Sequence, residues 1–560
     1  MINSYKVYLL LFLLIVNSCE SFIKRPVKAA VVSARKEASD IGIEIMSKGG
    51  NAFDAMIATG LALSVCYPNA GNIAGGGFLV YRTYDGKYGS LDYREKAPLL
   101  ANRDMYLDSI GNILPEKSTL GGLAIGVPGT VAGLFEVHKK FGSLSWETLV
   151  EPSIRLAKIG YTVTKKQKKS FDSNRDKFIE INGKNTFYGK NFKIGDKISN
   201  LEYANTLELI KKYGKSGFYE GINAERFINS VKQSGGIISK DDLLAYSPVW
   251  RDPIQFKYKD LLITSMSPPS SGGVCLGQLF KMIEPYNIGQ YNHNSSESIQ
   301  LMVEAERRSY ADRSEFLGDP DFFDVPTNQL LDSIYLINRM SDFNWNQASL
   351  STDIKYGELS IRESDETTHY SIIDKYGNAV SVTTTLNGSY GSKVYVEDGG
   401  YFLNNEMDDF SSKPGSPNMF GLLGNEANSI HPEKRMLSSM TPTIVEKNKK
   451  LYLILGSPGG SKIITSVFQT IINTYEFKMN IQQAVSSSRF HHQWMPDEII
   501  FEPNKFSDYL IDDLKSKGYL INLDKSTSIG RVDAIMVDEN GFITCGADPR
   551  GDDFASYFRQ

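Results

Sequence analysis

Two strand-like runs joined by a short turn constrain this 560-residue chain more than any other stretch. The run 367–374 begins with two threonines and continues with alternating residues, and the run 379–385 ends in three threonines. Between them lies a short turn that contains Gly377. A three-residue loop with glycine in its last, left-handed position is a favoured hairpin turn. The sequence therefore predicts a β-hairpin at this place.

The length of the turn sets the register of the predicted hairpin. If Asp374 pairs with Asn378, then Thr367 lies directly across the ladder from Thr385, within the reach of cross-strand pairs. Threonine is enriched in strands by propensity alone. Taken by itself, the hairpin therefore favours a ladder of threonines that faces solvent, and any chemical role depends on its surroundings.

Composition excludes several classes of function. The chain carries 61 Lys and Arg against 65 Asp and Glu, a net charge of −4, so neither nucleic acid nor an anionic membrane surface is an expected partner. Its four cysteines and six histidines match no zinc-site or disulfide spacing. We expect neither a catalytic metal nor another cofactor.

Residues 1–18 predict an export signal. Lys6 supplies the positive charge, and the apolar core 7–16 is too short to span a bilayer as a mature helix. The following Cys19 ends a sequence similar to a bacterial lipobox, in which the cysteine is lipidated, although Asn17 departs from the usual small residue. A lipid anchor through Cys19 and simple secretion both stay open. In either case we expect a periplasmic or secreted protein.

The Thr-Thr-His-Tyr-Ser motif at 367–371 resembles the γ-glutamyltransferase (γ-glutamyltranspeptidase, glutathione hydrolase) family. Similar motifs lie around 71–98, 403–410, 435–440 and 456–461, and the resemblance runs from about residue 28 to the C-terminus. In that family the chain cuts itself before the first threonine of this motif. The resemblance implies cleavage between Glu366 and Thr367, with Thr367 as nucleophile and Thr385 as the hydroxyl that orients it.

The fold implied by the family is an α+β, four-layer αββα sandwich of the N-terminal-nucleophile (Ntn) hydrolase class. A large subunit (19–366) and a small catalytic subunit (367–560) would come from one precursor and stay interlocked as one domain. The segment 342–366 is polar without clear periodicity, which is typical of a flexible connector. The stretch 411–434, rich in Pro, Gly, Ser and Asn, predicts a lid loop over a pocket.

The resemblance also implies a clamp for the amino-acid end of a γ-glutamyl substrate. Taken alone, Arg94 would be a surface ion pair, but a guanidinium can grip a carboxylate with two parallel hydrogen bonds, which lysine cannot do. The implied contacts to the α-carboxylate are Arg94, Ser438 and Ser439, and those to the α-ammonium are Asn387, Glu406 and Asp409.

Gly459 and Gly460 follow a predicted strand and open an amphipathic helix. This arrangement leaves backbone N–H groups uncovered at the positive end of the helix, and the resemblance implies that they stabilise the oxyanion. An ordinary strand-to-helix turn is the alternative. The G-x-S-x-G pattern does not fit, so a serine-hydrolase elbow is not supported.

An N-terminal threonine carries its own general base, because its free α-amine has a pKa of about 7.7–8.0. An uncut chain has an amide there instead, so the precursor is expected to be inactive. The predicted enzyme cleaves the γ-glutamyl amide of glutathione through a threonine ester and passes the acyl group to water, an amino acid or a dipeptide. Phe420 lies where some family members have a lid tyrosine, which leaves the balance between hydrolysis and transfer open.

Two alternatives remain. One is an Ntn acylase that acts on glutaryl or cephalosporin-type amides. Its substrate lacks the α-amine, so the clamp of Asn387, Glu406 and Asp409 argues against it. The other is a non-catalytic exported lipoprotein that binds amino acids or peptides, which predicts an uncut chain.

Overall fold

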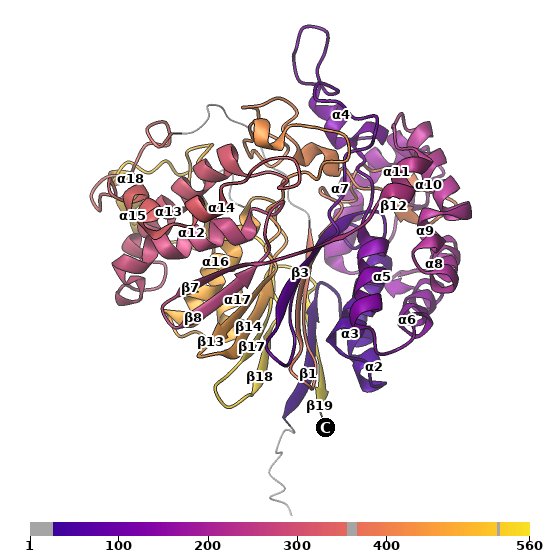
Figure 1. Ribbon diagram of the computed structural model, residues 1–560, viewed down its shortest axis with the longest axis horizontal. Coiled ribbons are helices and arrows are strands. Elements are labelled where there is room, and N and C mark those ends of the chain that lie inside the picture. The colour runs from indigo at the N-terminus through magenta and orange to yellow at the C-terminus, as the bar shows by residue number, and fades with distance from the viewer. Residues whose placement is uncertain (1–25, 356–366, 524–526, 560) are drawn as a thin grey trace, which may run out of the picture.

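The computed structural model describes residues 26–355, 367–523 and 527–559. The predicted export signal, Cys19 and Glu366 lie outside these described residues. Two antiparallel sheets stack at the centre, and helices cover the outer face of each (Figure 1). This order of layers confirms the predicted α+β, αββα sandwich. None of the described helices is long and apolar enough to cross a bilayer.

The first sheet has seven strands in the order β19-β1-β9-β10-β2-β3-β6. Every residue of its central pair, β9 and β10, is buried, because helices cover one face of this sheet and the second sheet covers the other. The strands are β1 (Val27–Ser33), β2 (Gly76–Arg82), β3 (Tyr88–Asp92), β6 (Val249–Arg251), β9 (Thr368–Ile373), β10 (Ala379–Thr385) and β19 (Phe554–Arg559).

The second sheet has six strands in the order β18-β17-β14-β13-β8-β7. Both sheets combine strands from before and after residue 367, so the two parts of the chain share each layer. The strands are β7 (Ile254–Tyr258), β8 (Leu261–Ser265), β13 (Thr443–Lys447), β14 (Lys450–Gly456), β17 (Asp533–Val537) and β18 (Ile543–Gly546).

Helices α2 (Lys36–Ser47), α3 (Ala52–Cys66) and α5 (Thr130–Phe141) pack on the seven-stranded sheet. The α3 helix is apolar on all sides, and every one of its residues is buried, because α6 (Trp146–Ile159) packs on it from outside. Further helices on this side are α4 (Pro115–Thr119), α7 (Lys165–Asn182), α8 (Leu201–Tyr213), α9 (Ser216–Tyr219), α10 (Gly221–Gln233) and α11 (Lys240–Ala245).

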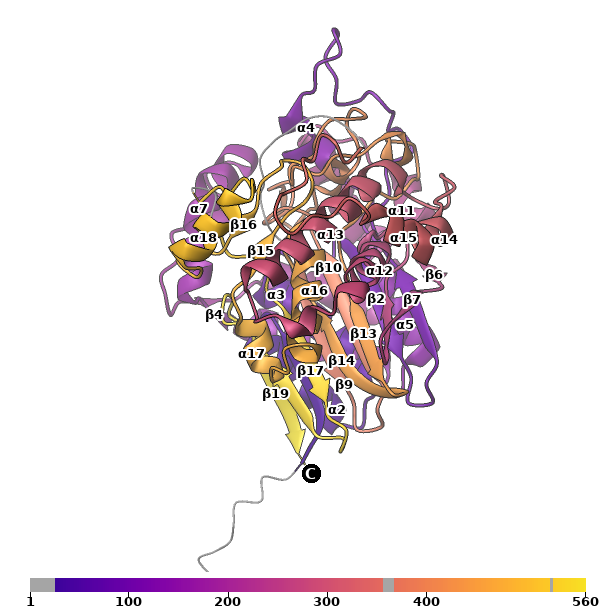
Figure 2. The ribbon, with the colours of Figure 1, turned by 90° about the vertical axis from the view of Figure 1, so that its left-hand side faces the viewer.

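Helices α12 (Gly272–Ile283), α16 (Lys462–Tyr475) and α17 (Ile481–Ser486) pack on the six-stranded sheet. Helix α13 (Ser296–Phe316) packs against α12, and Figure 2 shows α13 and α16 in front of β13 and β14. The remaining elements on which the site does not depend include α14 (Thr327–Leu330), α15 (Ser333–Arg339), α18 (Asp508–Ser516), β4 (Tyr161–Thr162), β5 (Lys197–Ile198), β11 (Tyr395–Val396), β12 (Tyr401–Phe402), β15 (Phe490–His491) and β16 (Ile500–Phe501).

The predicted hairpin and its register are confirmed. Ile373 pairs with Ala379 in the β9–β10 ladder, and the Asp374 N–H donates to the Asn378 carbonyl at 3.1 Å. Gly377 ends the three-residue turn with a φ of 97°, in the left-handed region where glycine has no steric penalty. Thr367 lies one residue before β9, so this register places it opposite Thr385.

The expectation of a flexible connector over 342–366 is wrong for its first part. The Trp494 indole N–H lies 2.9 Å from the Ser351 carbonyl and 3.1 Å from the Ile354 carbonyl, and Ile354 itself is buried. The Ala348 N–H donates to the carbonyl of Lys517 at 2.7 Å. An irregular segment held by a distant tryptophan has no periodicity by which sequence could reveal it. Residues 356–366 lie outside the described residues.

Candidate functional site

Nine of the ten residues predicted for catalysis and substrate binding line one small cavity. The tenth, Gly459, lines a neighbouring groove. The cavity lies where the end of β10, the end of β14 and the segments after β3 and before β13 meet. The nine are Arg94, Thr367, Thr385, Asn387, Glu406, Asp409, Ser438, Ser439 and Gly460.

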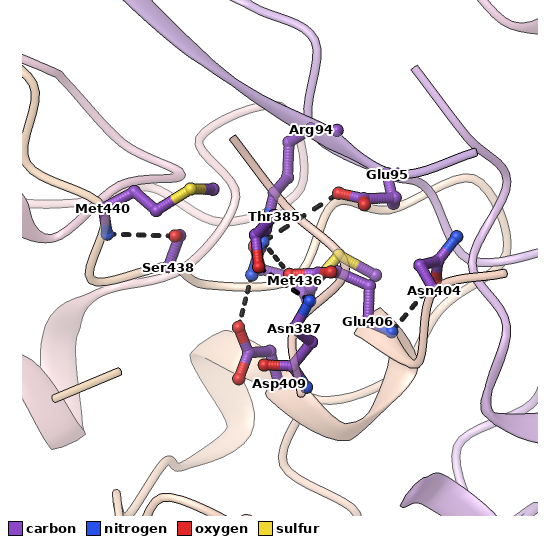
Figure 3. A network of polar contacts seen from close by, with 12 residues as sticks. Arg94, Glu95, Thr385, Asn387, Asn404, Glu406, Asp409, Met436, Ser438 and Met440 are labelled. Atoms are coloured by element: carbon purple, nitrogen blue, oxygen red, sulfur yellow. Dashed lines mark hydrogen bonds and ion pairs between the residues drawn. The ribbon is translucent and has the colours of Figure 1, made fainter. Parts of the chain in front are cut away.

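Thr367 and Thr385 lie at the open end of the β9–β10 hairpin. Thr367 is buried, and its carbonyl accepts a hydrogen bond from Arg531 at 3.4 Å. The Thr385 hydroxyl accepts the N–H of Asn387 at 2.7 Å. Asn387 has a φ of 71°, which asparagine tolerates better than most residues. The chain therefore turns sharply after β10, and the Asn387 side chain reaches the cavity (Figure 3).

Gly459 and Gly460 connect β14 to the start of α16. Their φ values are 131° and 52°, so both positions favour glycine. Within the described part of the chain, neither N–H donates to a backbone or side-chain acceptor. Two free donors thus precede the positive end of a buried helix. Only the Gly460 position also borders the cavity.

Arg94 follows β3 and is only 1% exposed, which excludes the surface ion pair. Its guanidinium donates to the carboxylates of Glu406 and Asp409 (Figure 3). Burial by itself lowers the pKa of Arg94, but these two carboxylates outweigh burial and raise it. Arg94 also donates to the Leu437 carbonyl at 3.2 Å, just before the paired serines.

The two acids belong to a short 3-10 helix, η5 (Glu406–Asp409). Burial raises the pKa of Glu406 to about 7, and Arg94 opposes that rise. Burial likewise raises the pKa of Asp409, again against Arg94. The protonation of both acids therefore depends on the charges of the groups beside them.

Glu95, which was not predicted from the sequence, lies beside the Arg94 guanidinium (Figure 3). Its carboxyl is fully buried, 3.9 Å from the Arg94 guanidinium and close to the Glu406 carboxylate. Burial and then the charge of Glu406 hold the pKa of Glu95 well above its usual range. The signal in the sequence was weak, because an acid beside an arginine is ordinary on a surface.

Arg313, a cavity-lining residue on α13, was likewise not predicted from the sequence. Its guanidinium donates to the Ser439 hydroxyl at 3.1 Å and to the Ser271 hydroxyl at 3.0 Å. An arginine in a helix that is otherwise buried was the available signal, since arginine is almost never buried without a reason.

The loop 411–434 covers part of the cavity, as the sequence predicted. Phe420 and Leu422 are buried and line it. Two acids of η5 hold this loop: the Met419 N–H donates to Asp408 at 2.8 Å, and the Asn418 amide donates to Asp409 at 3.0 Å. The loop is thus tied to the same short helix that contacts Arg94.

A model of the gamma-glutamyltranspeptidase family matches residues 38–558. The chain belongs to this family. The glutathione hydrolase proenzyme of Escherichia coli is 41% identical over 541 residues, which are 95% of this chain and 93% of that protein. The protein of the same name from Pseudomonas aeruginosa is 41% identical over 528 residues, 93% of each chain. The resemblance seen in the sequence motifs is confirmed.

Solved structures place this gamma-glutamyltranspeptidase-family chain among Ntn hydrolases, as predicted. The Helicobacter pylori gamma-glutamyltranspeptidase is 40% identical, covers 58% of this chain and 94% of its own, and has a TM-score of 0.56. A cephalosporin acylase from Bacillus halodurans has a TM-score of 0.82 and covers 96% of this chain and 97% of its own. At 24% identity, that second likeness speaks for the fold alone.

Proposed function

We propose that this member of the gamma-glutamyltranspeptidase family is a self-cleaving γ-glutamyltransferase and glutathione hydrolase. The observation that carries the proposal is that Thr367, Gly460 with its uncovered amide, and a balanced set of charged side chains line one cavity. Two of its relatives, each 41% identical, are named glutathione hydrolase proenzymes, which supports both the activity and a precursor form.

Cleavage between Glu366 and Thr367 creates the catalytic base. The freed α-amine of Thr367 takes the proton of the hydroxyl on the same residue, which an amide nitrogen cannot do. Thr385 orients the nucleophile from across the hairpin, and its position opposite Thr367 in the β9–β10 register supports this role. The parts 19–366 and 367–560 then form the large and small subunits and remain together, because both sheets contain strands of each.

The reaction forms a bond between the Thr367 hydroxyl oxygen and the γ-carbonyl carbon, and breaks the amide C–N bond. The proton moves from the Thr367 α-ammonium to the leaving amine, which is Cys-Gly when glutathione is the substrate. The amides of Gly459 and Gly460 stabilise the oxyanion, a contribution of about 3–4 kcal/mol for one donor in comparable sites. Water, or the amine of an amino acid or dipeptide, then attacks the ester.

The clamp holds a zwitterion between opposite charges. Arg94, Ser438 and Ser439 hold the α-carboxylate, and Asn387, Glu406 and Asp409 hold the α-ammonium. In the structure Arg94 contacts the two acids directly. A zwitterionic group inserted between them supplies each side with a counter-charge and so replaces that ion pair. A glutaryl amide, which lacks the ammonium, leaves both acids uncompensated.

The cut is tested by a denaturing gel of the purified protein and N-terminal sequencing of the smaller fragment. We expect two bands, with the smaller beginning Thr-Thr-His-Tyr-Ser. Thr367→Ala should stay at full size and lack activity, whereas Thr367→Ser keeps a hydroxyl and should still be cut. A single intact band in active enzyme overturns the proposal, and an intact inactive chain favours the binding lipoprotein.

The substrate class is tested by comparing γ-glutamyl-p-nitroanilide with glutaryl-p-nitroanilide. The proposed clamp predicts a much higher kcat/KM for the γ-glutamyl compound. A preference for the glutaryl compound favours the acylase alternative. Both compounds release the same p-nitroaniline, so the difference reports only on recognition of the α-amine and α-carboxylate.

We also propose that residues 1–18 direct export, on the basis of the sequence pattern alone. Radiolabelled palmitate on Cys19, or sensitivity of maturation to globomycin, distinguishes a lipid anchor from free secretion.

A further inference from the structure

Two buried arginines line the cavity, and their surroundings differ. Arg94 forms ion pairs with two carboxylates. Arg313 is 3% exposed and, among the described residues, no carboxylate oxygen lies within 4.0 Å of its guanidinium. Its hydrogen-bond partners are two hydroxyls, those of Ser271 and Ser439. The positive charge of Arg313 therefore lacks a direct counter-charge on its own wall of the cavity.

An unpaired buried charge is costly. Removing an ion from water costs several kcal/mol or more unless an opposite charge compensates, and arginine does not escape by losing its proton in proteins. Burial lowers the pKa of Arg313 by more than the neighbouring Asp409 raises it, and Arg94 lowers it further. Serine hydroxyls satisfy donors but bring no negative charge. An anion that enters the cavity would therefore be strongly favoured beside Arg313.

The charged residues that line the cavity indicate what kind of group would carry this anion. They are two arginines, Arg94 and Arg313, and two acids, Glu406 and Asp409. The set is balanced, so it suits a ligand group that is itself a zwitterion. Glu406 and Asp409 lie together on η5, and Arg313 reaches the cavity from α13 beside Ser439. An ammonium at the acids then leaves the carboxylate beside Ser439 and the second arginine.

We propose that Arg313 is a second α-carboxylate-binding residue, which together with Ser439 and Arg94 makes the site selective for substrates with an α-carboxylate. The proposal rests on the γ-glutamyl activity proposed above and extends it. Arg94 alone is already neutralised by two acids, whereas Arg313 adds the positive charge that the substrate carboxylate needs.

A hydrogen bond to Ser271 also orients the Arg313 guanidinium for binding a carboxylate. Its Nε donor is directed to the Ser271 hydroxyl, and Ser271 in turn donates to the Ser438 carbonyl through its hydroxyl at 2.7 Å and its N–H at 2.8 Å. The same small network thus orients the guanidinium and the paired-serine segment. Lysine has no planar fork with which to reach Ser271, Ser439 and a carboxylate together.

The test compares γ-glutamyl-p-nitroanilide with 4-aminobutanoyl-p-nitroanilide, which keeps the amine and lacks the carboxylate. For Arg313→Lys and Arg313→Gln we expect kcat/KM on the γ-glutamyl compound to fall about 10- to 100-fold, mainly through KM, as for loss of charge-assisted hydrogen bonds. The rate on the 4-aminobutanoyl compound should change little. The ratio of the two kcat/KM values is independent of how much enzyme has been cut.

Two further variants keep the test sharp. Ser271→Ala removes the hydrogen bond that orients Arg313 but keeps the positive charge. It should lower the ratio of kcat/KM on the γ-glutamyl compound to that on the 4-aminobutanoyl compound by a smaller factor. Arg308→Lys is the matched control, because Arg308 is buried on the same helix but pairs with Glu304 and Asp342, outside the cavity. Its ratio should match the wild-type protein.

An equal loss on both compounds in the Arg313 variants assigns Arg313 a purely structural role and overturns the inference. Failure of the proposed function itself looks different, because the wild-type protein would then cleave neither compound. Competition by L-glutamate and by 4-aminobutanoate against the wild-type and Arg313→Lys enzymes gives a second measurement. Only the inhibition constant for L-glutamate should rise.

Discussion

The cavity has two ends that are built in different ways. The reacting end is lined by Thr367, Thr385 and Gly460, at the end of one hairpin and at one strand-to-helix turn, and Gly459 lies next to it in a neighbouring groove. The other end would bind the α-carboxylate and α-ammonium of the substrate, and is called the head-binding end. It consists of Arg94, Arg313, Glu406 and Asp409, which come from three separate segments. Backbone turns position the residues of the reacting end, whereas ion pairs between charged side chains position those of the head-binding end. A substitution should therefore change kcat at the reacting end and KM at the head-binding end.

The largest effect should come from Gly460→Ala at the reacting end. An added Cβ would lie 2.6 Å from the Phe420 ring, at a backbone φ of 52° that disfavours alanine. Displacing the Gly460 amide should lower kcat by about 10²- to 10³-fold with a smaller change in KM. Gly541→Ala is the control, because Gly541 also has a positive φ but nothing within 4 Å of its Cβ position. An unchanged kcat would remove Gly460 from the oxyanion site.

Asp409→Asn should act on the head-binding end. It removes a charge that contacts Arg94, so kcat/KM should fall about 10- to 100-fold, mostly through KM. Asp408→Asn is the control, because Asp408 lies on the same short helix but contacts Ser118 and Met419 instead of Arg94. Steady-state kinetics on the γ-glutamyl anilide make the comparison. Equal KM values for the two variants would contradict the assignment of Asp409.

Thr385→Val should have a smaller effect, on the cut as well as on turnover. The buried N–H of Asn387 would lose its acceptor, a cost of about 1–3 kcal/mol, so both processing and kcat should slow by about 10-fold. Thr384→Val removes a hydroxyl on the opposite face of the same strand, which donates to the Gly76 carbonyl. The time course of precursor loss on gels distinguishes the two. Equal slowing would argue against a special role for Thr385.

The smallest effect should be a pH-dependent change in stability from Glu95→Gln. Because its pKa is raised in the folded protein, Glu95 stays protonated there while the unfolded chain releases the proton above about pH 4. Folding stability therefore falls as pH rises above that value. Glutamine removes this loss, so Tm should rise relative to the wild-type protein more at pH 8 than at pH 5.

Glu433→Gln, on an exposed glutamate, is the control for that measurement and should show the same Tm difference at both pH values. Thermal unfolding of the Thr367→Ala precursor background keeps the chain uncut and the comparison simple. A Glu95→Gln effect that does not grow with pH would show that Glu95 is ionised in the fold.

The reacting end could be predicted from the sequence. Turn length and Gly377 set the hairpin register, and two successive glycines after a strand left amides uncovered at a helix start. These features depend on neighbours along the chain, so local rules are enough to predict them. The family motifs located the residues of the clamp, but not their contacts.

The contacts of the head-binding end became visible in the three-dimensional structure. It showed that Arg94 contacts Glu406 and Asp409, that Arg313 lines the cavity from α13, and that Glu95 is buried beside Arg94. It likewise showed that residues 342–355 are held in place by a distant tryptophan. The free-energy cost of burying a charge depends on which distant segments of the chain surround it. No local sequence pattern indicates which segments these are.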